Sequence, residues 1–173
     1  MKKTFKTIED LENALMEPVT PEEQKEREEK AEEIKAKEWI EEFEKKPNVM
    51  KNHDGSYNVD GNVNLSQKNI KKLPVKFNIV KGSFLCYNNY LTSLEGAPNK
   101  VGGTFTCWNN QLTSLEGAPK EVGGDFWCGY NQLTSLEDAP KEVGENFECH
   151  NNPGKFTEED VRKVCNVKGK IYV

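Results

Sequence analysis

The sequence predicts a solenoid, a stack of similar coils in which each coil contributes a strand to a common parallel β-sheet. Two observations support this prediction. The string LTSLEGAP begins at Leu91 and again at Leu112, and LTSLEDAP follows at Leu133, so the chain repeats itself every 21 residues. Within each unit, two apolar residues alternate with residues expected outside, which is the pattern of a strand with one buried face.

Five columns of identical or similar residues run through the repeat. Phenylalanine and cysteine columns lie two residues apart and mark the buried face of the strand, and an asparagine column marks the turn after it. Valine and glycine columns precede the strand. The columns are Phe84, Phe105, Phe126 and Phe147; Cys86, Cys107, Cys128 and Cys149; Asn89, Asn110, Asn131 and Asn152; Val80, Val101, Val122 and Val143; and Gly82, Gly103 and Gly124. Stacking buries an apolar side that one coil alone cannot bury.

The same register reaches both ends of a repeat domain at residues 54–173. A degenerate first coil covers 59–79 and has Lys68 where the asparagine belongs, and regular coils cover 80–152. Asp60-Gly61 is either a hairpin turn or part of that incomplete first coil. A capping helix and a last strand are expected over 156–173, with Thr157 as N-cap and Asp160 at N3 of the helix. Val161 and Cys165 would face the last coil.

Residues 1–50 form a charged, helical N-terminal segment. A short amphipathic helix is expected at 7–16, and a longer one begins at Thr20-Pro21 and ends near Lys46, with Thr20 as N-cap. Trp39 and Phe43 give the second half of this helix an apolar patch. The patch either packs on the first coil as a cap or belongs to a helical arm that binds a partner or a second copy of the chain.

These columns match the leucine-rich-repeat pattern L-x-x-L-x-L-x-x-N-x-L, with Phe and Cys in place of two leucines. Asn-Gln-Leu-Thr-Ser-Leu at 110–115 and 131–136 resembles the short repeats of bacterial effector proteins. The linkers of GAPKEVGG type and the closing NVKGKIYV resemble repeat proteins encoded by bacteriophages. The resemblance covers about residues 54–173 and implies a leucine-rich-repeat solenoid that binds other proteins. The departures, such as Lys68 and Pro153-Gly154, lie at its ends.

Composition and motifs exclude several classes of function. Residues 1–46 hold 10 Lys+Arg against 15 Asp+Glu, whereas residues 47–173 hold 14 against 14, so neither part has the basic surface of a duplex nucleic-acid binder. Base stacking of single-stranded nucleic acid on aromatic residues is a weaker alternative, because a positive groove is missing. No apolar run is long enough to span a membrane. The cysteines form one inward column without a C-x-x-C pair, which favours small buried hydrophobes over metal ligands. We therefore expect no enzyme activity, no cofactor and no metal.

The residues that vary from coil to coil indicate where a partner binds. Positions before, between and after the inward phenylalanine and cysteine are expected on the exposed face of the sheet, and several of them carry large aromatic side chains. Such residues favour interface hot spots, although they could instead shield neighbouring coils. The candidate partner-binding residues are Leu85, Tyr87, Thr106, Trp108, Asp125, Trp127, Tyr130, Glu148 and His150, with Trp39 and Phe43 as a secondary site.

The sequence thus predicts a non-enzymatic scaffold that binds a protein through its sheet face. The resemblance to bacteriophage proteins implies work in the host cytoplasm, as an inhibitor or modulator of a bacterial host protein, for example one used in defence. The alternative is a structural or virion-associated repeat protein that assembles into a homo-oligomer through its helical arm.

Overall fold

The computed structural model describes residues 20–173, and the helix expected at 7–16 lies outside them. The chain divides into two compact units at Lys46 and Pro47. The first unit contributes helix α2 (Pro21–Glu44), and the second contains the strands and helix α3 (Glu158–Val164). Val49 and Met50, which the sequence placed in the helical segment, lie in a strand of the second unit.

Helix α2 begins as its sequence predicts. The Thr20 hydroxyl accepts a hydrogen bond from the Glu23 backbone N–H, and the Glu23 carboxylate accepts one from the Thr20 N–H, so two otherwise unpaired donors are satisfied. The Trp39 and Phe43 rings stack one helical turn apart, with centroids 4.6 Å from each other. In residues 20–173 no helix is both long enough and apolar enough to cross a lipid bilayer.

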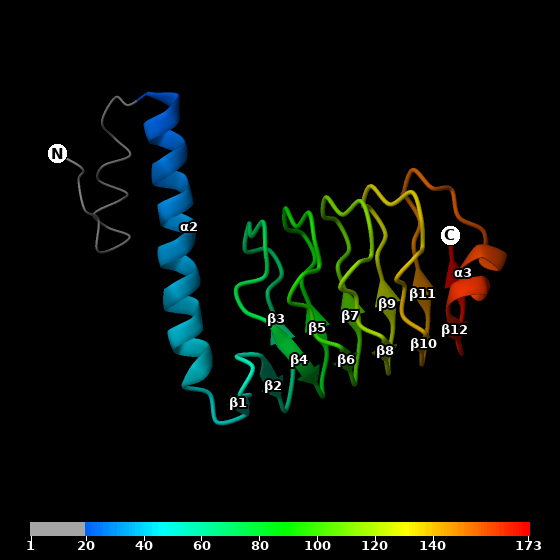
Figure 1. Ribbon diagram of the computed structural model, residues 1–173. Helices are drawn as coiled ribbons and strands as arrows, with labels where there is room; N and C mark the ends of the chain where they lie inside the picture. The colour runs from blue at the N-terminus through cyan, green and yellow to red at the C-terminus, as the bar shows by residue number, and fades with distance from the viewer. Residues whose placement is uncertain (1–19) are drawn as a thin grey trace. The chain divides into compact units, whose positions relative to one another are not determined.

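The second unit is a parallel β-solenoid of about six turns, with successive coils 21 residues apart along most of its length (Figure 1). Its coils contribute to two sheets, sheet A and sheet B. Sheet A contains β1 (Val49–Lys51), β2 (Tyr57–Val59), β4 (Phe77–Val80), β6 (Lys100–Val101), β8 (Glu121–Val122), β10 (Glu142–Val143) and β12 (Asn166–Val167). Sheet B contains β3 (Val63–Asn64), β5 (Phe84–Leu85), β7 (Phe105–Thr106), β9 (Phe126–Trp127), β11 (Phe147–Glu148) and β13 (Ile171–Tyr172).

Sheet B is the sheet that the phenylalanine column predicts, and its register pairs Phe105 with Phe126. Sheet A was not predicted, because the valine column was interpreted only as the approach to the next strand. Most strands of sheet A are two residues long and bury one side chain each, as Glu121–Val122 does, so they are too short to show alternation.

Stacked glycines form the corner between the two sheets. Gly102, Gly123 and Gly144 follow the valine of successive coils, and each donates its N–H to a valine carbonyl of the preceding coil. An added Cβ at Gly123 would lie 2.1 Å from the Gly102 carbonyl oxygen. These coils therefore approach each other at the glycine positions more closely than a side chain there permits, whereas Lys81 holds the same position in an outer coil.

Phenylalanine, cysteine, valine and leucine columns fill the core. The rings of Phe84 and Phe105 stack with centroids 5.6 Å apart and an interplanar angle of 8°, and Phe105 stacks on Phe126 in nearly the same way. All four cysteines of the column are buried and free, as expected. The Cys128 thiol donates to the Glu148 carbonyl of the next coil at 3.3 Å.

The asparagine column satisfies backbone groups inside the turn, as the sequence predicts. The Asn131 amide donates to the carbonyls of Cys128 and Gly129 in its own coil and of Cys107 in the preceding coil, at 3.1–3.2 Å. Its oxygen accepts from the Leu112 N–H at 3.1 Å. One buried side chain thus replaces water for four backbone groups.

We expect the four thiols of the cysteine column to react slowly in the native protein. Burial raises the pKa of Cys107 to about 12 and that of Cys86 and Cys128 well above its ordinary value, so the reactive thiolate is scarce. A chromogenic disulfide reagent should modify them only as the chain unfolds, and at once in denaturant. Rapid modification of all four native thiols would contradict this burial.

An antiparallel hairpin, not a coil, starts the second unit. Strand β1 pairs with β2, and the turn between them contains Asp54 and Gly55, which has a φ of 80°. Asp60-Gly61 is not a hairpin turn, because Val59 and Val63 on its two sides pair in parallel with the next coil. The incomplete-coil interpretation is therefore the correct one.

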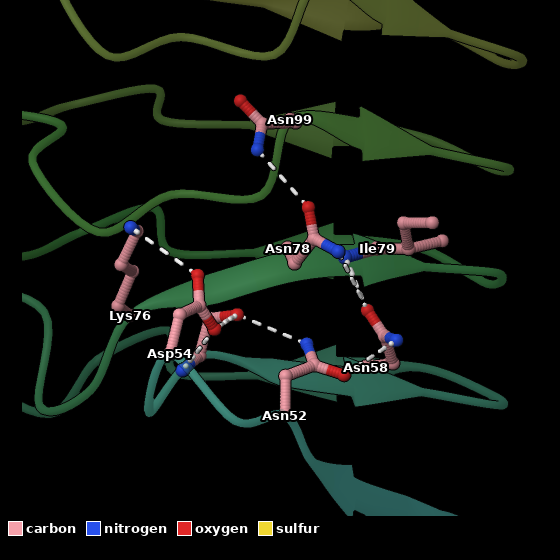
Figure 2. A network of polar contacts seen from close by, with 8 residues as sticks. Asn52, Asp54, Asn58, Lys76, Asn78, Ile79 and Asn99 are labelled. Carbon is pink, nitrogen blue, oxygen red and sulfur yellow. Dashed lines mark hydrogen bonds and ion pairs between the residues drawn. The ribbon is translucent and has the colours of Figure 1, made fainter.

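Polar side chains hold this hairpin to the first coils (Figure 2). The Asn58 amide donates to the Asn52 oxygen at 3.0 Å, Asn78 donates to Asn58 at 3.1 Å, and Asn99 donates to Asn78 at 3.1 Å. In the turn, Asp54 accepts from the Ser56 N–H and hydroxyl. This ladder adds side-chain hydrogen bonds to the buried apolar contacts of Tyr57 and Phe77 at the beginning of sheet A.

Helix α3 caps the last coils. The Thr157 hydroxyl accepts from the Asp160 N–H, and the Asp160 carboxylate accepts from the Thr157 N–H, which confirms the predicted N-cap. Val161 and Cys165 are buried, as expected of the face turned to the core. The register slip is also confirmed, because Phe147 pairs with Ile171, 24 residues later.

Candidate binding face

The outward side chains of sheet B and of the turn after it form one surface, called here the sheet B face. Of the predicted site residues, Trp127 and Tyr130 are the most open, at 38% and 45% exposure. Half-buried side chains surround them: Leu85, Tyr87, Trp108, Asp125, Glu148 and His150. The structure therefore brings eight of the nine predicted residues to the surface of this face.

Thr106 is the exception, because it is buried at 3% exposure, and the exposure expected for it is wrong. In the strand register it lies between Leu85 and Trp127, which both have larger side chains. Its hydroxyl oxygen lies 3.4 Å from the Trp108 N–H, which donates to it. Thr106 therefore packs beneath the exposed side chains of the sheet B face and is not accessible to a partner.

Three rings on neighbouring coils form an aromatic cluster. The Trp108 and Tyr130 centroids lie 4.9 Å apart with an interplanar angle of 61°, and the Tyr130 and His150 centroids lie 5.1 Å apart at 81°. The rings meet edge to face instead of stacking flat, and Trp108 and His150 flank Tyr130. Trp108 and His150 come from equivalent turn positions two coils apart, which Tyr130 bridges.

Gly129 makes the space for this cluster. It occupies the position that Tyr87, Trp108 and His150 hold in the other coils, and it is buried. A Cβ at Gly129 would lie 3.3 Å from Cδ1 of Trp108 and 3.3 Å from Oε1 of Glu148. The neighbouring side chains therefore lean over a coil that has no side chain at this position.

Tyr130 holds a backbone conformation that suits other residues better. Its φ is 52°, in the left-handed region that asparagine tolerates and bulky residues avoid. The other coils place Gln67, Asn88, Asn109 and Asn151 at this position, all with φ between 53° and 57°. A tyrosine here costs about 1 kcal/mol in backbone strain, and it puts a large ring on the open face.

Two carboxylates lie on the same face as the rings. The Oε1 atom of Glu148 lies 3.2 Å from Nδ1 of His150, and the Glu148 side chain is 20% exposed. Asp125 accepts hydrogen bonds from the backbone and side-chain N–H groups of Asn146 in the next coil. The face thus combines aromatic surface with negative charge.

Sequence reasoning missed one aromatic residue of this face. Tyr172 pairs in register with Glu148 and is 48% exposed, so it extends the outward column that contains Trp127. The signal was present in the sequence, because the 24-residue slip that places Ile171 in the phenylalanine column also places its neighbour outside.

The secondary site lies in the first unit. Phe43 is buried at 3% exposure, whereas its stacking partner Trp39 is half-buried. Phe43 therefore lacks the open surface that a docking residue needs in this state.

No protein-family model matches the chain, and no curated protein or solved structure matches it significantly.

Proposed function

We propose that this chain is a non-enzymatic protein-binding scaffold of the leucine-rich-repeat kind, which uses the sheet B face as its recognition surface. On its resemblance to bacteriophage-encoded repeat proteins, it works in the cytoplasm of a bacterial host, where it inhibits or modulates a host protein. A small protein without a catalytic site acts most simply by occupying its target's surface.

The observation that carries the proposal is the conformation of Tyr130. Asparagine at this position would suit the backbone, and it would continue the side-chain ladder in which Asn109 donates to Asn88 at 2.8 Å. The chain instead accepts backbone strain to place a tyrosine between Trp108 and His150. Strain of this kind is typical of sites where function outweighs stability. Exposed aromatic residues of this type are also the common anchors of protein interfaces.

We expect Tyr130→Asn to abolish partner binding while the free energy of unfolding stays within about 1 kcal/mol of wild type. Relief of the left-handed strain, about 1 kcal/mol, offsets the loss of two edge-on ring contacts of similar size. Binding is measured by quantitative capture from bacterial lysate, and stability by denaturant unfolding.

Tyr90→Gln is the matched control. Tyr90 is similarly exposed but lies beyond the asparagine turn, where other coils carry Gln111 and Gln132. A protein captured by wild type and by Tyr90→Gln, but not by Tyr130→Asn, supports the proposal. Unchanged capture by Tyr130→Asn contradicts it, as does a large loss of stability, which would make the cluster a structural element.

A further inference from the structure

We propose that the aromatic cluster and Glu148 bind an arginine side chain of the partner protein, an inference that rests on the proposed function. It concerns the chemistry of the residue that the cluster recognises. Three features lead to it: the arrangement of the rings, the charge on the face and the acceptor that remains on Glu148.

The rings present π surfaces to a cation. Trp108, Tyr130 and His150 meet edge to face at 61° and 81°, so each contact covers one ring face, where a flat stack would cover two. Trp127, on the adjoining strand, adds a further exposed ring. A planar guanidinium stacks on such rings, which attract positive charge to their faces, and its stem packs on the apolar edges.

The charge on the face favours a positive group. Across the outward columns of sheet B from Asn62 to Tyr172, the acidic residues are Asp125 and Glu148, and Lys170 near the C-terminal edge is the one lysine or arginine. A phosphate-rich ligand such as RNA would meet these carboxylates without basic compensation. A basic side chain meets attraction from both.

Glu148 supplies the directional contact. Its Oε1 atom holds His150, and among the described residues no hydrogen bond or ion pair engages its Oε2 atom, on a side chain that remains 20% exposed. A guanidinium donates charge-assisted hydrogen bonds to a carboxylate while it stacks on a ring, whereas an ammonium lacks the planar stack. The cluster therefore suits arginine better than lysine.

The test is a titration of wild type with the peptide acetyl-Gly-Ser-Arg-Ser-Gly-amide, followed by NMR of the tryptophan indole N–H groups. We expect saturable shifts of the Trp108 and Trp127 signals with a dissociation constant on the order of 1 mM, since one side chain provides few contacts. The same peptide with citrulline in place of arginine keeps the shape without the charge. It should bind at least about tenfold more weakly.

Glu148→Gln is the informative variant, because glutamine keeps an oxygen for His150 and removes the charge. This variant should bind the arginine peptide at least about fivefold more weakly than wild type. Glu116→Gln removes an exposed carboxylate elsewhere and should leave binding unchanged. Equal binding of the citrulline peptide, or unchanged binding by Glu148→Gln, overturns the inference, and so does tighter binding of a single-stranded RNA oligonucleotide at the same indoles.

Capture experiments separate this inference from the proposed function. If Tyr130→Asn loses the partner while Glu148→Gln retains it in full, the binding face stands and the arginine inference fails. If neither variant loses the partner, the proposed function itself fails. Loss in both variants, together with discrimination against citrulline, supports the two together.

Discussion

Gly123→Ala should destabilise the solenoid by about 3 kcal/mol or more, because the added methyl group would overlap the backbone of the neighbouring coil. The new Cβ would lie 2.1 Å from the Gly102 carbonyl oxygen and 3.0 Å from its carbonyl carbon. Both atoms belong to the backbone of the neighbouring coil, so no side chain can rotate away. The φ of Gly123 lies outside the left-handed region, which makes the penalty one of contact and not of backbone strain. Denaturant unfolding followed by circular dichroism measures it.

Lys81→Ala is the control at the same position of an outer coil. Lys81 donates its N–H to Val59 just as Gly123 donates to Val101, but it already carries a side chain, which is exposed and paired with Asp60. Loss of this surface ion pair should change the free energy of unfolding by less than about 1 kcal/mol. Equal stability of Gly123→Ala and wild type would show that the coils are farther apart at this corner than described.

Asn131→Ala should cost about 3 kcal/mol, because it leaves buried backbone groups without partners. The Cys107, Cys128 and Gly129 carbonyls lose a shared donor, and the Leu112 N–H loses its acceptor. Each buried unsatisfied group costs about 1–3 kcal/mol, although carbonyls that keep a second hydrogen bond lose less. Thermal and denaturant unfolding give the value.

Asn99→Ala removes an asparagine of the same repeat from an exposed position. Its amide donates to the Asn78 side chain near solvent, so water replaces the lost contact. The expected change is below about 1 kcal/mol. If the two alanine variants were equally stable, the asparagine column would owe its regularity to something other than buried hydrogen bonds.

The repeat predicted those parts of the fold that local chemistry determines. Thr157 and Asp160 form an N-cap within four residues of chain, and Phe105 and Phe126 occupy equivalent places because the coils are equivalent. Sheet A was not predicted, because its strands are defined by hydrogen bonds to neighbouring coils and not by a local sequence pattern. A two-residue strand such as Glu121–Val122 becomes visible only through its neighbours on either side.

The hairpin at the start of the second unit had a readable signal. Asp54-Gly55 between two short apolar runs is a typical hairpin turn, yet Asp60-Gly61, the same dipeptide, was considered instead. The two dipeptides differ in the residues on their N-terminal side. Val59, before Asp60-Gly61, belongs to the 21-residue register and pairs with Val80, whereas the strand before Asp54-Gly55 lies outside the register and pairs antiparallel.

The sequence predicted which residues lie on the candidate face, but neither the burial of Thr106 nor the backbone conformation of Tyr130. Thr106 is covered because Leu85 and Trp127 are larger, a property of the neighbours that its own column does not show. Tyr130 was identified from its variation, whereas its strained backbone emerged only from the structure. The asparagines at the equivalent positions were the one hint in the sequence, since asparagine tolerates that conformation.

The coil-to-coil hydrogen bonds have a consequence for the length of the molecule. Each of the first three phenylalanines of the column donates its backbone N–H to the carbonyl of the residue just before the phenylalanine of the next coil. Phe84, Phe105 and Phe126 thus donate to Thr104, Asp125 and Asn146 in turn. Each boundary between two interior coils is therefore formed by the same backbone N–H and carbonyl groups. Duplication or deletion of one 21-residue segment would restore every backbone bond at the new junction and alter only which side chains stand next to each other outside. The proposed recognition surface can thus be enlarged or rearranged by whole coils, while the architecture that displays it is preserved.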